Sequence, residues 1–211
     1  MTVSLIRYVR RVTNTFQLKV TLRGATPAIW RRLAVPGNLN LERLHLVIQD
    51  SMGWENCHLH SFEVKGTEFG VPDPDSMFGT DVESEKRHTL ERLVGAKDRF
   101  SYTYDFGDHW LHDVVVETVT PGEPGAPRCI AGAGACPPED CGGVWGYAEL
   151  VAALANEHHE RHEELAEWVP TGWSPERFDL ELADRLVARH RPQPGRPRTA
   201  SKKPSRPRAR A

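Results

Sequence analysis

Histidines and an aspartate gather in two short segments whose residue types suit metal binding or proton transfer. His58 and His60 stand two apart, and Asp108 and His112 flank Trp110 in the segment Asp108-His-Trp-Leu-His112. Residues two apart on a β-strand share a face, so each segment would present its side chains together. Neutral imidazole and carboxylate bind zinc, manganese or iron, and they also serve as general acids and bases. The two hypotheses are a groove or metal site and histidines that hydrogen-bond to hold a turn.

Three of the four cysteines lie in a segment rich in glycine and proline, Cys129–Tyr147. Six residues separate Cys129 from Cys136, and four separate Cys136 from Cys141. With a fourth ligand from the Cys57–His60 segment, these thiolates would form a tetrahedral zinc site. No Cys-x2-Cys pair is present, so buried or loop thiols are the alternative. The glycines and prolines predict an ordered or metal-tied loop that leads into a helix.

Two further pairs of carboxylates are typical of turns and helix ends. Asp105 and Asp108 border a glycine and are expected to accept hydrogen bonds from main-chain amides. The pair Glu139-Asp140 follows two prolines. We expect this pair to cap the next helix or to form an ion pair with Arg31 or Arg32.

The C-terminal end carries a charge opposite to that of the rest of the chain. Eight of the 27 Lys and Arg residues lie from residue 191 onward with no acid among them, so the other 19 face all 29 Asp and Glu residues. Five prolines and few apolar side chains predict that residues 191–211 are a disordered tail. Such a tail would attract nucleic acid non-specifically through counterion release, or it would stay solvated without a partner. The cations of this hypothesis are Arg196, Arg198, Lys202, Lys203, Arg206, Arg208 and Arg210.

Length and hydropathy limit the domain organisation. The 211 residues suit a lead-in over residues 1–13, one domain over residues 14–190 and the tail. No apolar run approaches the roughly 18 residues of a membrane span, and the N-terminus has no apolar core of a signal peptide. We therefore expect a cytoplasmic protein with reduced thiols and no membrane partner.

The periodicity of apolar residues gives the elements that must position these groups. Alternation predicts strands at roughly residues 16–22, 29–35, 59–64, 100–106 and 110–119. Helical spacing predicts helices at roughly residues 41–52, 89–94, 146–156, 159–168 and 175–189. Strands first and helices later predict an α+β fold, in which helices cover a mixed or antiparallel sheet and the C-terminal section is helical.

Three sequence blocks together carry a family resemblance. The blocks are Leu22–Phe62, with Trp30 and Gly53-Trp54, then Tyr104–Glu117, and then Cys129–Tyr147. In this order and spacing they resemble the plasmid pRiA4b ORF-3-like family over about residues 14–170. The resemblance implies an α+β domain that occurs on plasmids and transposons and has no assigned activity. A resolvase-type label attached to some relatives finds no support, because no nucleophilic Ser or Tyr lies among clustered arginines.

From these observations we expect a non-catalytic binding or accessory protein of mobile-element origin. Its ligand would lie in a groove between the sheet and the Cys129–Tyr147 loop, with weak nucleic-acid contact through the tail. The first alternative is a metal-dependent, hydrolase-like enzyme that uses His58, His60, Asp108 and His112. The second alternative is a structural zinc protein. The sequence identifies no substrate, and zinc is the one cofactor that it suggests.

Overall fold

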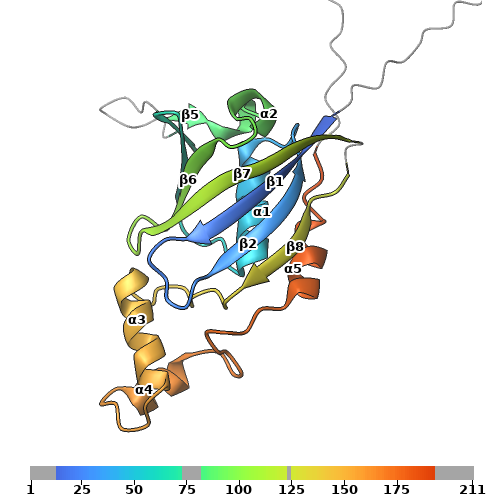
Figure 1. Cartoon of the computed structure of the whole chain (residues 1–211). Coiled ribbons are helices and arrows are strands. Elements are labelled where there is room, and N and C mark those ends of the chain that lie inside the picture. The colour runs from blue at the N-terminus through green and yellow to red at the C-terminus, as the bar shows by residue number, and fades with distance from the viewer. Residues whose placement is uncertain (1–12, 73–81, 123–124, 193–211) are drawn as a thin grey trace, which may run out of the picture.

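The computed structural model describes residues 13–72, 82–122 and 125–192 and contains one eight-stranded sheet (Figure 1). The strand order is β5-β4-β3-β6-β7-β1-β2-β8, and neighbouring strands are antiparallel except for the parallel pair β4–β5. The strands are β1 (Thr13–Leu22), β2 (Trp30–Pro36), β3 (His60–Val64), β4 (Thr67–Gly70), β5 (Glu83–Ser84), β6 (Arg99–Tyr104), β7 (Trp110–Gly122) and β8 (Arg128–Ala133). The helices are α1 (Leu41–Met52), α2 (Leu90–Leu93), α3 (Gly143–Leu154), α4 (His162–Trp168) and α5 (Leu180–Val187), with a 3-10 turn at Glu85–Arg87.

The sheet has one buried face and one solvent-facing face. Along β1, Phe16, Leu18 and Val20 are buried, whereas the residues between them are half-buried. This alternation is the two-residue period of a strand, and it directs the apolar set toward α1. In Figure 1, α1 lies behind the sheet, and no helix of the described residues covers the face toward the viewer. The predicted α+β fold, a mixed sheet with covering helices, is confirmed.

Helix α1 covers the buried face and ends where the site begins. The Asn40 side chain accepts a hydrogen bond from the main-chain amide of Arg43, which caps the first turn. Leu44, Val47 and Ile48 recur at helical spacing and are all buried. Gly53 ends the helix in a left-handed conformation, φ 107°, which glycine adopts without strain. The chain then turns into the loop that carries Cys57 and His58.

Arg31 joins the end of α1 to strand β8. Its guanidinium is buried and stacks on the Phe178 ring, with Cζ 3.9 Å from the ring centre. Its N–H groups donate at 2.6–3.3 Å to five main-chain carbonyls, those of Trp30, Ser51, Met52, Ala133 and Gly134. Burial lowers the pKa of Arg31 to about 10, so the side chain stays cationic at neutral pH.

Strand β8 corrects the prediction of a continuous loop over residues 129–147. Its residues pair with β2 although Gly132 lies among them, and close packing leaves no room for a larger side chain at that position. A Cβ atom on Gly132 would lie 2.5 Å from the Phe178 ring. Only the later part of the segment is a loop, and it leads into α3 as expected.

Helices α3 and α4 form a small second core of Leu150, Ala153 and Leu165. The start of α3 is fixed to the turn between β6 and β7, because the Gly142 amide donates to Asp108 Oδ2 at 3.0 Å. The α3, α4 and α5 helices occupy the predicted helical C-terminal section with shifted boundaries. None of the helices in the described ranges has the length and apolar character to cross a membrane.

Candidate metal centre

Three loops from distant parts of the sequence meet beside the start of β3 and the end of β6. The loop after α1 supplies Cys57 and His58, the turn after β6 supplies Asp105, and the loop before α3 supplies Glu139 and Asp140. The Asp105 amide donates to the Leu59 carbonyl at 2.8 Å, which continues the β3–β6 pairing past the end of the strands. This pairing places Asp105 beside His58.

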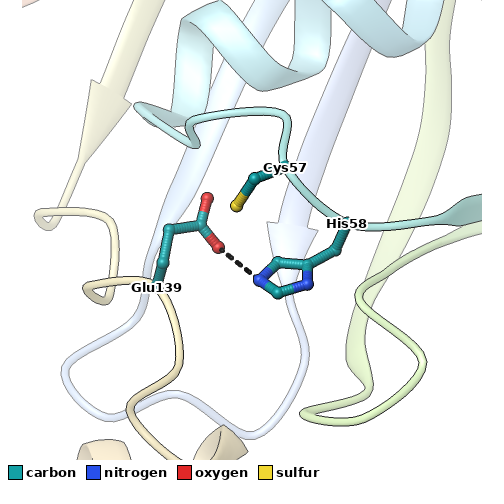
Figure 2. Close-up of side chains that lie close together, drawn as sticks. All are labelled: Cys57, His58 and Glu139. Carbon is teal, nitrogen blue, oxygen red and sulfur yellow. Dashed lines mark ion pairs between the residues drawn. The ribbon is translucent and has the colours of Figure 1, made fainter.

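His58 is at the centre of the cluster. Its Nε2 lies 3.2 Å from Asp140 Oδ1, 3.8 Å from Asp105 Oδ2 and 3.8 Å from Glu139 Oε2. Two ligands about 2.1 Å from one tetrahedral ion stand about 3.4 Å apart, so each of these distances suits an ion shared with His58. Asp105 and Asp140 form one ligand group with His58, and Glu139 belongs to another. Figure 2 shows His58 and Glu139 approaching from opposite loops, with the Cys57 sulfur directed into the space between them. The Cys57, His58 and Glu139 donor atoms all lie within 4.8 Å of one another.

The cluster has an excess of negative charge and unsatisfied buried atoms. Among the described residues, His58 is the only basic side chain within ion-pair distance of Asp105, Glu139 and Asp140. His58 Nε2 and Glu139 Oε2 are both inaccessible to solvent, and neither has a hydrogen-bond partner in the described part of the chain. Buried polar atoms are nearly always paired, and an ion bound between these two atoms would pair both of them. The chemistry of the donor set therefore fits a divalent cation.

The two most buried carboxylates each have one oxygen held by N–H or O–H donors. Asp105 Oδ1 accepts from the Gly107 amide at 2.8 Å. Glu139 Oε1 accepts from the Glu55 amide at 2.7 Å and from the Tyr104 hydroxyl at 3.0 Å. Burial raises the pKa of Tyr104, so the phenol stays protonated and donates. In both carboxylates the other oxygen is the one that faces His58.

Three loop residues adopt a left-handed backbone conformation, which residues other than glycine rarely do. Asn56 has φ 56°, Asp105 has φ 54° and Asp140 has φ 56°. Asn and Asp tolerate this region best, because their short side chains hydrogen-bond to the nearby backbone. Such conformations concentrate at functional sites, where the surrounding structure holds them. The side chains of two of these residues, Asp105 and Asp140, reach His58.

A buried network behind the cluster holds the Asn56 conformation. His45 Nε2 donates to Asn56 Oδ1 at 2.7 Å, which leaves His45 Nδ1 to accept from the Tyr102 hydroxyl at 2.8 Å. The Tyr102 oxygen in turn accepts from Gln49 Nε2 at 2.8 Å. This tautomer follows from Asn56 Oδ1, which can only accept. Burial lowers the pKa of His45 to about 3, so the ring is neutral.

The structure does not bring together the histidines expected to form one site. Strand β3 begins at His60, so His58 lies in the preceding loop, whereas His60 faces the core. His60 stacks on His45 with ring centres 3.4 Å apart and donates to the buried Glu85 carboxylate at 2.8 Å. Trp110 and His112 are buried on β7, and Asp108 binds the start of α3. The alternation of β3 and β7 is as predicted, but it directs these rings into the core.

The three candidate zinc thiolates also form no ligand group in the described residues. Cys129 is buried on β8, Cys136 lies in the loop beneath Trp173, and Cys141 precedes α3. Burial raises the pKa of Cys129 to about 11 and that of Cys141 to about 12, and it raises the pKa of Cys136 as well. No group of three or more ligand side chains in the described residues includes any of them. The cations of the tail lie outside the described residues.

Sequence reasoning found His58 but missed its partners. Asp105 does accept a main-chain amide, as expected, yet its second oxygen faces His58. Glu139 and Asp140 were expected to cap α3 or to pair with Arg31 or Arg32. Instead, Arg31 binds carbonyls and Arg32 pairs with Glu117 on the solvent-facing side of the sheet. The sequence feature that could have identified these partners is the pair Glu139-Asp140, two adjacent carboxylates in a loop rich in glycine and proline.

Comparison with known proteins defines the class of protein. Residues 14–182 match the model of the plasmid pRiA4b ORF-3-like protein family, and the chain belongs to this family. The chain is 44% identical over 162 residues to the uncharacterised protein y4hQ of Sinorhizobium fredii, which covers 74% of this chain and 81% of y4hQ. It is also similar to the crystal structure of MM3350, a protein of unknown function from Methanosarcina mazei. That match has a TM-score of 0.74 and 37% identity, and it covers 81% of this chain and 98% of MM3350.

Proposed function

We propose that this protein binds a divalent metal ion at Cys57, His58 and Glu139, with Asp105 and Asp140 close to the same histidine. The proposal depends mainly on one observation: His58 Nε2 and Glu139 Oε2 are buried at ligand separation without hydrogen-bond partners among the described residues. An ion would satisfy both atoms and neutralise the carboxylates that no Lys or Arg of the described residues pairs with. This donor set replaces the one expected from the sequence, in which His60, Asp108 and His112 joined His58.

The arrangement suits hydrolysis better than simple structural binding. The Asp140 side chain is 75% exposed, whereas those of Asp105 and Glu139 are 9% and 12% exposed. The cluster is therefore accessible to solvent at Asp140 and Cys57 and in part at His58, whose side chain is 27% exposed, and a catalytic site requires such access. A cavity of about 230 Å³ adjoins Asp140 between α3 and α4 and has room for part of a substrate. A bound ion would act as a Lewis acid, while Asp140 would accept a proton from water that enters there.

Metal analysis of the untagged protein tests this proposal. We expect about one zinc, manganese or iron ion per chain by plasma mass spectrometry, and calorimetric titration of the EDTA-treated protein should show one site. His58→Ala and Glu139→Gln should each lose at least about 100-fold in affinity, because each removes a direct ligand. His158→Ala is the matched control, since His158 is an exposed histidine away from the cluster. Unchanged binding by His58→Ala, or no site at all in the wild-type protein, would contradict the proposal.

The basic tail supports a second and separate proposal, that residues 191–211 give weak contact with nucleic acid. It is supported by the charge asymmetry of the sequence alone, with eight cations and no acid in this segment. Deletion of residues 191–211 should lower the affinity for a random-sequence DNA duplex at low salt and reduce its salt dependence. Equal affinity of the two proteins would refute this role. The accessory role on mobile elements stays a prediction, because the names of the relatives state no activity.

A further inference from the structure

Glu139 has two oxygens in different environments. Oε1 accepts two hydrogen bonds, from the Glu55 amide and from the Tyr104 hydroxyl, whereas Oε2 has no partner among the described residues and faces His58. Asp105 repeats the arrangement, with Oδ1 held by the Gly107 amide and Oδ2 toward His58. Each carboxylate thus offers one oxygen to the centre of the cluster, while its other oxygen is already engaged.

We infer that Tyr104 is a positioning residue that holds Glu139 as a one-oxygen ligand and thereby selects a transition metal over calcium. The inference rests on the proposed metal centre and adds which class of ion it takes. Calcium prefers six to eight oxygens, commonly including both oxygens of a carboxylate. Imidazole, a nearby thiol and one-oxygen carboxylates suit zinc, iron or manganese instead. The selection depends on keeping Glu139 Oε1 engaged.

Tyr104 is placed to do this because it joins two of the three loops. It is fully buried on β6, and its ring packs against Trp54 at a centre distance of 5.2 Å. Its oxygen accepts from the Cys57 amide at 3.1 Å while its hydroxyl donates to Glu139. The phenol therefore fixes the loop that carries Cys57 and His58 relative to Glu139. Groups that orient metal ligands in this way change metal affinity by about 10–100-fold when they are removed.

Tyr104→Phe tests the inference, because it removes the hydroxyl and keeps the ring. Tyr147→Phe is the matched control, since Tyr147 is also buried but lies on α3, and its hydroxyl has no hydrogen-bond partner among the described residues. Zinc, manganese and calcium are titrated into EDTA-treated wild-type and variant proteins, and denaturant unfolding checks that each is folded. We expect Tyr104→Phe to weaken zinc binding by about 10–100-fold and to reduce the zinc-to-calcium affinity ratio. Tyr147→Phe should keep the wild-type ratio.

The ratio separates positioning from general destabilisation. A variant that is only less stable binds both ions less well. In Tyr104→Phe, Glu139 Oε1 keeps only the hydrogen bond from the Glu55 amide and is freer to bind an ion, which favours the ion that takes both oxygens. An unchanged ratio in folded Tyr104→Phe would overturn the inference and leave the metal centre intact. Absence of any ion site in the wild-type protein would instead overturn the proposed function. Wild-type protein that binds calcium as tightly as zinc would refute the selection of a transition metal, even if Tyr104→Phe does not fold.

Discussion

Arg31 and the His58 cluster are both ionic groups within the fold, and they differ in how their polar atoms are satisfied. The five N–H groups of Arg31 donate to five carbonyls, although no carboxylate pairs with it in the described residues. The His58 cluster has three carboxylates and an imidazole, yet two of its buried atoms have no partner in the described ranges. Burial of a charge is costly in both places, but only Arg31 is fully compensated by the protein itself.

This difference separates an architectural role from a binding role. Arg31 extends from a regular strand and has no donor left for a ligand, so it can only hold α1, β2 and β8 together. The cluster residues come from loops, and three positions around it have a left-handed backbone. A fold retains unsatisfied atoms and strained loops when something outside the chain completes them. Changes at the two regions should therefore have opposite effects on stability.

The largest expected effect is the loss of stability in Arg31→Ala. The substitution leaves five carbonyls without donors and a void beside Phe178. We expect a loss of about 4 kcal/mol in the free energy of unfolding, measured by denaturant titration. Arg23→Ala is the control, because Arg23 forms an exposed ion pair with Asp113, and its removal should cost at most about 1 kcal/mol. Similar losses in the two variants would show that the carbonyl contacts of Arg31 contribute little.

Sequence patterns predicted the sheet well and the cluster poorly, for a physical reason. Alternation along Phe16–Leu22 reports burial directly, so β1 and β7 were predicted from local residues alone. Strand β8 was missed because its glycine, Gly132, fits a partner, Phe178, that is distant in the sequence. The same limit applies to the cluster, where Asp105 and Glu139 meet His58 only after three loops are placed by the sheet. Residue types identified His58, but periodicity placed it on a strand that begins two residues later.

A second prediction concerns buried histidines, which are neutral because burial disfavours the protonated ring. Burial lowers the pKa of His45 to about 3 and that of His112 to about 4, both below the unfolded value of about 6.5. The unfolded chain therefore binds more protons than the native protein between these values. Stability should fall as the pH falls from about 6.5 to about 4, by about 1.4 kcal/mol per pH unit for each histidine. The free energy of unfolding, measured in urea across this pH range, should depend less steeply on pH in His112→Leu than in the wild-type protein. An equally steep dependence on pH would contradict the lowered pKa of His112.

The smallest effect, and the sharpest test of the comparison, is expected from Asp140→Asn. Asparagine keeps the left-handed backbone at φ 56° and removes one of the three negative charges around His58. Without metal, relief of repulsion between carboxylates should stabilise the protein by about 0.5 kcal/mol in an EDTA-containing unfolding experiment. Zinc affinity should fall by about tenfold, because one charge that attracts the ion is gone. A variant that is less stable without metal would mean that Asp140 supports the fold, as Arg31 does, and that the two regions do not differ as proposed.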